Sequence, residues 1–150
     1  MRLVIQRVSK SSVKVNGKIV GAIDNGLMVL LGVTHEDDKQ DATWLSKKLC
    51  NMRLFRDEDD KMNLSVKEVV GEVLVVSQFT LFAATKKGTR PSFMHAAAPE
   101  KAEELYEFFK RLIESELGKQ VQSGVFGADM KLSIENDGPV TITLDSKNKE

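Results

Sequence analysis

The sequence lacks several features that would place it in a class at once. Its single cysteine, Cys50, cannot form a disulfide within the chain, which favours a reducing, cytoplasmic location. Its 22 basic and 22 acidic side chains cancel, so no excess of cations is present to coat long stretches of nucleic acid, although one nucleotide end can still be held. No apolar run approaches the ~20 residues of a membrane helix, and the N-terminal run is too short for a signal peptide. We therefore expect no membrane partner.

The common motifs of cofactor and metal enzymes are missing as well. Neither GxGxxG nor GxxxxGK followed by Ser or Thr occurs, so no glycine-rich loop is available to cradle phosphates. His35 and His95 are the only histidines, and a zinc site would need scattered carboxylates besides them. The acidic run at 57–60 lacks the glycine and distal glutamate of a calcium loop. We expect no cofactor and no metal ion, and a packed, inert thiol at Cys50.

The apolar pattern predicts one α/β domain over residues 1–150. Turn signals such as Asn16-Gly17 separate short runs rich in β-branched residues, which indicates hairpins and a mixed, largely antiparallel, barrel-like sheet. Two main helices are expected, at about 38–52 and from Pro99 to Gly118. The polar residues 146–150 are expected to form a frayed tail. The expected strands are 4–8, 13–15, 18–23, 27–33, 53–55, 73–79, 121–125, 130–134 and 140–144.

Two polar segments stand beside apolar strands. Ser77-Gln78-Phe79-Thr80 follows the apolar run 73–76, where a fixed backbone can present polar side chains to a pocket, although a strand edge that meets water fits equally well. Asn136-Asp137-Gly138 is typical of a turn, and Pro139 then enters an apolar strand in which a missing N–H is awkward. A Gly-Pro bond is also a place where a cis peptide is accessible. From these residues alone, an ordinary hairpin turn is the simpler interpretation of the second segment.

Together the two segments resemble the paired motifs of the D-aminoacyl-tRNA deacylase family. The resemblance implies an enzyme, a carboxylic ester hydrolase, that cleaves a D-amino acid or glycine from the terminal adenosine of a tRNA, including glycine mischarged on tRNA(Ala). It also implies a homodimer with its active sites at the subunit interface. Further stretches resemble the family in the same order, over essentially the whole chain except the last few residues: 5–8, 30–33, 61–64, 74–76, 90–93 and 126–130.

The resemblance assigns the hydrolytic pocket to the end of the run 73–76. The residues that would line it for the terminal adenosine and the ester are Ser77, Gln78, Phe79 and Thr80. Thr80 is the candidate nucleophile, but the sequence shows no base placed to activate its hydroxyl. An aminoacyl ester is an activated bond, so we favour attack by oriented water, with backbone donors and the terminal 2′-hydroxyl of the tRNA assisting.

The second motif would supply the choice between D- and L-amino acids. By resemblance, Gly138-Pro139 is a cis peptide that reaches into the neighbouring subunit's pocket, with its carbonyl oxygens toward the substrate amino group. An L side chain would then strike rigid main chain, which cannot rotate away as a side chain can. The resemblance further implies that Arg7 orients this motif and that Met130 contacts the substrate.

A basic loop at 85–92 follows the pocket motif. Its cations, Lys86, Lys87 and Arg90, would meet phosphates at the acceptor end of the tRNA, or would simply be solvated. Two other functions stay open beside chiral proofreading. One is a related deacylase that removes a small L-amino acid from mischarged tRNA, and the other is a module that binds the tRNA end without catalysis.

Overall fold

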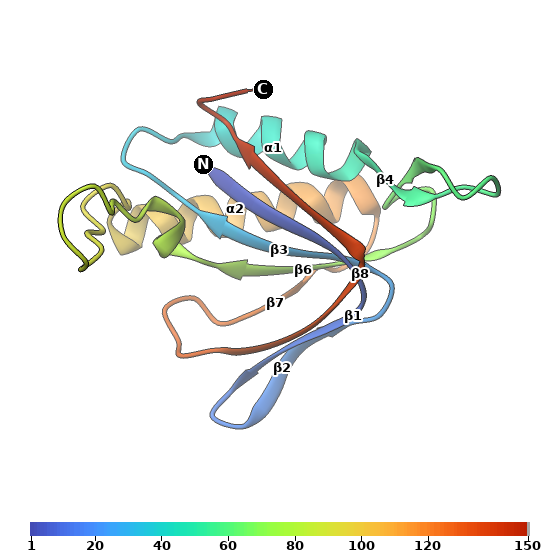
Figure 1. The fold of residues 1–150 in the computed structure, drawn as a ribbon, viewed down its shortest axis with the longest axis horizontal. Helices are drawn as coiled ribbons and strands as arrows, with labels where there is room; N and C mark the ends of the chain where they lie inside the picture. Colours follow the sequence, from blue (N-terminus) through green and yellow to red (C-terminus); the bar gives the residue numbers. More distant parts are fainter. Residues whose placement is uncertain (150) are drawn as a thin grey trace.

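Two long strands form the spine of the structure. β1 (Arg2–Val15) and β8 (Lys131–Asp145) pair antiparallel along most of their lengths in the computed structural model, which describes residues 1–149 (Figure 1). The other edge of β1 pairs with β3 (Gly26–Gly32) through its first half and with β2 (Lys18–Ile23) through its second half. The chain from β1 to β3 therefore folds back on itself as one long hairpin.

The sequence predicts a break within each spine strand, at residues 9–12 and at Asn136-Asp137-Gly138, and both predictions are wrong. The polar stretch stays in β1 because its hydroxyls bond to β8: the Ser11 hydroxyl donates to the main-chain oxygen of Ser133 at 2.9 Å. In β8 the predicted turn is instead an irregularity of the ladder, whose register with β1 shifts on both sides of Val8.

The middle of the sheet is parallel. β6 (Glu72–Ser77) runs beside β3 in the same direction, and the short β7 (Gln122–Ser123) runs beside β6. Side chains on both faces of β3 and β6 are buried, as the unbroken apolar runs predict. The sheet is thus mixed and largely antiparallel, which confirms the predicted fold class.

The strands β2 and β7 meet and nearly close the sheet into a barrel. A Cβ built on Gly21 of β2 would lie 2.7 Å from the main-chain oxygen of Ser123 in β7. The missing side chain at Gly21 is therefore what lets the two strands approach. The barrel interior holds a small apolar cluster of Val8, Val13, Ile23, Met28, Leu74 and Val76.

Two helices, α1 (Lys39–Asn51) and α2 (Pro99–Leu117), pack on each other and cover one face of the sheet (Figure 1). α1 begins at a capping box in which the Asp38 and Asp41 side chains each accept from the other's backbone N–H. α2 begins with proline at its first position and ends at Gly118, whose φ is 65°. Both helices lie where the sequence predicts them. No helix within residues 1–149 is long and apolar enough to span a membrane.

The larger core lies between these helices and the sheet. Cys50 is fully buried in it, and burial raises the pKa of its thiol to about 12. A thiol with so high a pKa stays protonated and unreactive at neutral pH, as predicted. The largest fully buried side chains of this core include Tyr106, Phe109, Leu45, Leu49 and Ile113.

Two further differences from the prediction concern short elements. β4 (Arg53–Arg56) forms a small separate sheet with β5 (Met62–Ser65), a strand that the sequence did not indicate because its first two residues are exposed and no apolar alternation is visible. The strand predicted at 73–79 ends at Ser77, and a 3₁₀ helix, η1 (Phe79–Phe82), follows it.

The predicted frayed tail is wrong for its first residues. Ser146 is buried, its backbone N–H donates to the main-chain oxygen of Met1 at 2.9 Å, and its hydroxyl accepts from the Met1 amino group at 2.7 Å. Lys147 donates to the Asp41 carboxylate at 2.8 Å, and Lys149 lies over the ring of Trp44. Glu150 lies outside the described residues.

Candidate functional site

A cleft of about 740 Å³ opens at the carboxyl ends of β3 and β6. The parallel register places Leu31 opposite Ser77, so both strands end at the same edge of the sheet. The first turn of α2 and the segment 126–130 complete the walls, and most of the lining side chains are apolar. Ligand sites form readily where parallel strands end, because the loops that follow diverge there.

The first motif of the sequence enters this cleft. Ser77, Gln78 and Phe79 line it, while Thr80 lies on η1 and is not part of the lining. The Gln78 side-chain amide donates to the Thr80 hydroxyl at 2.5 Å. An amide cannot accept a proton as a general base does, so this contact orients the hydroxyl without activating it.

Two exposed aromatic rings stand at the cleft. Phe79 and Phe93 pack edge to face, with ring centroids 5.1 Å apart and an interplanar angle of 78°, and both line the cleft. Phe79 keeps 57% of its surface exposed and Phe93 keeps 39%. Exposed rings of this kind provide a surface on which a nucleobase can stack. Sequence reasoning missed Phe93, although the Arg90-Pro91-Ser92-Phe93 stretch was a signal.

The residues that the resemblance assigns to substrate binding lie in two separate places. Met130, just before β8, lines the cleft. Gly138 and Pro139 are exposed, lie further along β8 and take no part in the cleft of their own chain. The two motifs are therefore not brought together within one described chain. The peptide bond between Gly138 and Pro139 is cis, as the resemblance implies.

The buried side chain of Arg7 contacts the second motif at Asp137. Its Nη1 donates to the main-chain oxygen of Leu54 at 2.6 Å, and its Nε lies 3.0 Å from Oδ2 of Asp137. Gly138 has φ of 123°, and a Cβ there would lie 2.9 Å from Nη2 of Arg7. Only glycine fits this backbone without strain. The guanidinium thus contacts both the carboxylate and the main-chain oxygen of Asp137, the residue before Gly138.

The three cations of the basic loop are exposed. The loop that carries Lys86, Lys87 and Arg90 is closed at its base by paired backbone hydrogen bonds between Ala84 and Ser92, 2.7 and 2.9 Å long. Its base therefore adjoins Phe93, and the loop extends from the rim of the cleft.

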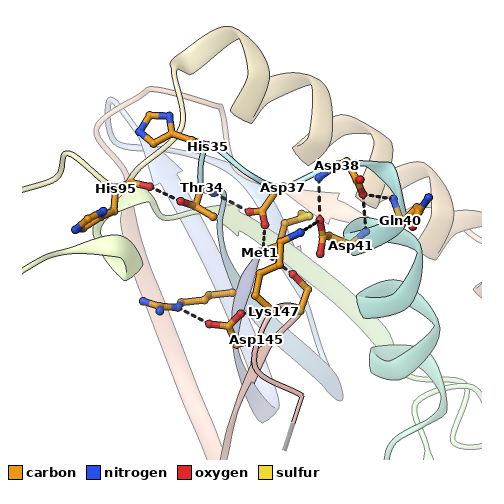
Figure 2. A network of polar contacts seen from close by, with 12 residues as sticks. Met1, Thr34, His35, Asp37, Asp38, Gln40, Asp41, His95, Asp145 and Lys147 are labelled. Carbon is orange, nitrogen blue, oxygen red and sulfur yellow. Dashed lines mark hydrogen bonds and ion pairs between the residues drawn. The ribbon is translucent and has the colours of Figure 1, made fainter.

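A polar network joins the stretch after β3 to His95 and to the amino group of Met1 (Figure 2). Thr34 donates from its hydroxyl to the main-chain oxygen of His95 at 2.5 Å, and Asp37 accepts from the Thr34 N–H at 2.7 Å. Asp37 also pairs with the amino group of Met1, and both groups are fully buried. Among residues 1–149, His35 is the one titratable side chain on the lining of the cleft. Sequence reasoning did not place this network, because its members are far apart in the chain.

Comparison with known proteins identifies the family of this chain. The family model described as D-Tyr-tRNA(Tyr) deacylase matches residues 4–145. The chain belongs to this deacylase family. Two members named D-aminoacyl-tRNA deacylase, from Flavobacterium psychrophilum and Akkermansia muciniphila, are each 57% identical to it over 150 residues, covering 100% of both chains.

Two solved structures have the same fold. One titled "c-Myc DNA Unwinding Element Binding Protein" superposes with a TM-score of 0.90 at 40% identity, covering 97% of this chain and 98% of that chain. Another, titled "Structural Analysis of a probable eukaryotic D-amino acid tRNA deacylase", has a TM-score of 0.81 at 20% identity, covering 95% and 97%. The fold and the family expected from the two sequence motifs are thus confirmed.

Proposed function

We propose that this chain hydrolyses the ester bond of D-aminoacyl-tRNA, releasing the free D-amino acid and the tRNA. Membership of the deacylase family supports an aminoacyl-tRNA hydrolase, and relatives that share 57% of its residues are named for this activity. One structural observation carries the proposal: the cleft joins Ser77–Phe79 to the exposed Phe79–Phe93 ring pair. This arrangement suits a terminal adenosine whose ester faces the end of β6.

The proposed chemistry is attack by water rather than by a side chain. The Thr80 hydroxyl accepts from an amide, and the lining of the cleft is mostly apolar. An aminoacyl ester is already reactive, so holding it against backbone donors and an oriented water suffices for a useful rate. The neighbouring 2′-hydroxyl of the substrate assists this water. A substrate that ends in a 2′-deoxy nucleotide should therefore react slowly.

The proposed choice of substrate depends on a second copy of the chain. Gly138 and Pro139 are exposed and lie outside the cleft of their own chain, while Arg7 holds the backbone that leads into them. In a homodimer with its sites at the interface, the partner's main chain at these positions forms one wall of the cleft. Its carbonyl oxygens accept from the substrate amino group. An L side chain then collides with this wall, while a D side chain points away from it.

Glycine follows from the same geometry. It has no side chain to meet the wall, so glycine mischarged on tRNA(Ala) is also a substrate under this proposal. A wall made of main chain excludes the L configuration and does not require any particular D side chain. Several D-amino acids are therefore accepted.

The rest of the tRNA is held by charge. Lys86, Lys87 and Arg90 extend from the rim of the cleft, where the phosphates of the acceptor end lie close to the bound adenosine. A chain with zero net charge makes few such contacts, so binding is modest and tolerant of tRNA identity. The proposed location is the cytoplasm, where aminoacyl-tRNA is made and used.

The test is deacylation of tRNA(Tyr) charged with labelled D- or L-tyrosine, measured as the release of the labelled amino acid. We expect turnover of the D ester and hydrolysis of the L ester close to the uncatalysed rate. Equal rates for both would refute chiral selection. Sedimentation of the same sample tests the homodimer, because an active monomer would rule out a wall supplied by a partner.

A further inference from the structure

We propose that Thr34 is a positioning residue of the cleft, and that Thr34, His35 and Asp37 act together as a clamp. The clamp fastens the segment 93–97 to the end of β3 and so sets the wall that faces the acceptor end of the substrate. The inference rests on the proposed function, because that function supplies the substrate. What it adds is a group outside both sequence motifs that determines how well the substrate binds.

Side chains on the β3 side hold two successive carbonyls of the segment. The Thr34 hydroxyl donates to the main-chain oxygen of His95 at 2.5 Å. The Nε2 of His35 lies 2.8 Å from the main-chain oxygen of Met94. A carbonyl can only accept, so Nε2 carries the proton of this imidazole. The side chains of Thr34 and His35 therefore reach across to the main chain of the segment.

Main-chain contacts complete the clamp. The backbone N–H of Ala97 donates to the oxygen of Val33 at 2.9 Å, and Thr34 forms an isolated β-bridge with Ala96. Lys101, in the first turns of α2, donates to the main-chain oxygen of His35. The end of the 93–97 segment and the start of α2 are thus both tied to residues 33–35, directly after β3.

Apart from the Phe93 ring on Phe79 and the packing of Ala97 on the core, few contacts hold the segment. It belongs to no helix or strand, and the side chain of Met94 is 81% exposed. Positions fixed by a few hydrogen bonds rather than by core packing respond strongly when one bond is removed. The Thr34 hydroxyl is therefore well placed to control this wall.

The clamp itself has a firm base. Oδ2 of Asp37 accepts from the Thr34 N–H at 2.7 Å, and Oδ1 of Asp37 lies 2.5 Å from the amino group of Met1 (Figure 2). The next residue, Asp38, opens the capping box of α1. A fully buried ion pair and a capped helix thus fix Thr34 relative to the core, so the 93–97 segment is the less supported side of the contact.

The wall so fixed carries Phe93 and Ala96, both of which line the cleft. Phe93 in turn packs against Phe79. The scissile ester is expected beside Ser77–Phe79, on β6 and η1, which the clamp does not touch. Loosening the clamp should therefore weaken substrate binding and leave the chemical step nearly unchanged.

Thr34→Val tests this, because valine has nearly the shape of threonine but no hydroxyl. We expect KM for D-tyrosyl-tRNA to rise about threefold to tenfold, with kcat within about twofold of the unaltered protein. Thr34→Ser keeps the donor and should restore KM. Thr43→Val is the matched control: that hydroxyl donates to Lys39 at 2.7 Å within α1 and should not affect KM.

A second measurement does not depend on activity. Hydrogen exchange at the backbone N–H of Ala97 should be faster in Thr34→Val and normal in Thr34→Ser and Thr43→Val. An unchanged KM in Thr34→Val, or a raised KM that serine does not restore, would overturn the positioning role. Unchanged exchange at Ala97 would overturn the clamp itself. Failure of the unaltered protein to release D-tyrosine would instead count against the proposed function, whatever the exchange shows.

Discussion

The Nε of Arg7 lies 3.0 Å from the carboxylate of Asp137, and this ion pair joins the middle of β1 to the residue that precedes Gly138. Arg7 is 2% exposed, whereas Asp137 is about half exposed. The buried Arg7 also donates to the main-chain oxygen of Leu54, so Asp137 is paired with a side chain that is itself anchored. We therefore expect the orientation of the Gly138-Pro139 main chain to depend on this side chain of β1.

Arg7→Lys should disturb this arrangement while keeping the charge. A lysine ammonium lacks the planar fork that reaches Leu54 and Asp137 together. We expect a loss of about 1–3 kcal/mol in the free energy of unfolding and at least a tenfold drop in kcat/KM for D-tyrosyl-tRNA. Denaturant unfolding and deacylation kinetics measure the two effects. Arg53→Lys, at an exposed arginine of β4 that bonds Asn63, is the control and should change neither.

Gly138→Ala should be more damaging than its size suggests. Its φ of 123° is strained for alanine, and the new Cβ would lie 2.9 Å from Nη2 of Arg7. Gly17→Ala is the matched control, because Gly17 also has positive φ, 76°, but nothing lies within 4 Å of its Cβ position. We expect both variants to lose some stability in thermal unfolding. Only Gly138→Ala should lose deacylation or D/L selectivity, and equal activity of the two variants would contradict the proposed role of this backbone.

Thr80→Val separates the two candidate mechanisms. If water attacks the ester, losing the hydroxyl removes only its contact with Gln78, and kcat should fall by less than about tenfold. If Thr80 is the nucleophile, turnover should vanish. Single-turnover deacylation with excess protein measures this step directly. Thr80→Ser should be close to the unaltered protein under either mechanism and serves as a check on folding.

Replacing Lys86, Lys87 and Arg90 by alanine should weaken tRNA binding without affecting the hydrolytic step. Every phosphate that a cation no longer neutralises should flatten the dependence of log KM on log salt concentration by roughly 0.7 to 0.9. If the dependence of log KM on log salt concentration is unchanged, the three cations do not contact the tRNA. Alanine at Lys47 and Lys48, exposed on α1, gives a control for the loss of positive charge as such.

The contact of Lys147 with Asp41 should make the stability of the fold depend on pH in the acid range. Burial opposes ionisation of Asp41, but hydrogen bonds from Lys147 and from the Asp38 N–H outweigh it and lower the pKa of the Asp41 carboxyl to about 2. A depressed pKa stabilises the fold above the unfolded value near 3.8, and this stability is lost as the pH falls toward 2. Asp41→Asn should therefore cost about 2 kcal/mol at pH 7 and much less at pH 2. Urea unfolding at both pH values measures the difference, and Asp59→Asn, at an exposed turn, should show none.

Much of the fold follows from local pattern. The positions of α1 and α2 could be predicted because caps and apolar spacing are written within each helix, and the central strands because their apolar runs are unbroken. The continuity of β1 and β8 could not, since the polar residues of β1 remain in the strand only through bonds to Ser133 and its neighbours, more than a hundred positions away. In β1 the pairing with β8 therefore outweighs the low strand propensity of the polar residues.

The site divides in the same way. The contribution of Ser77–Phe79 to the cleft was predictable, because it follows from the place where one strand ends. Thr80 was expected in the lining and lies beside it on η1, because the chain turns at Gln78, whose N–H donates to the Leu31 oxygen at 2.7 Å. His35 and Phe93 meet the cleft through loops separated by almost sixty residues, and no local spacing indicates their approach.

The close approach at Gly21 has a consequence for the behaviour of the molecule in concentrated solution. Because β2 and β7 approach each other there, the two outer strands of the sheet face one another instead of lying apart. A larger residue at Gly21 would separate β2 from β7 and expose the backbone groups along the edges of both strands. We therefore expect a larger residue at Gly21 to increase the tendency of the protein to aggregate through these strands.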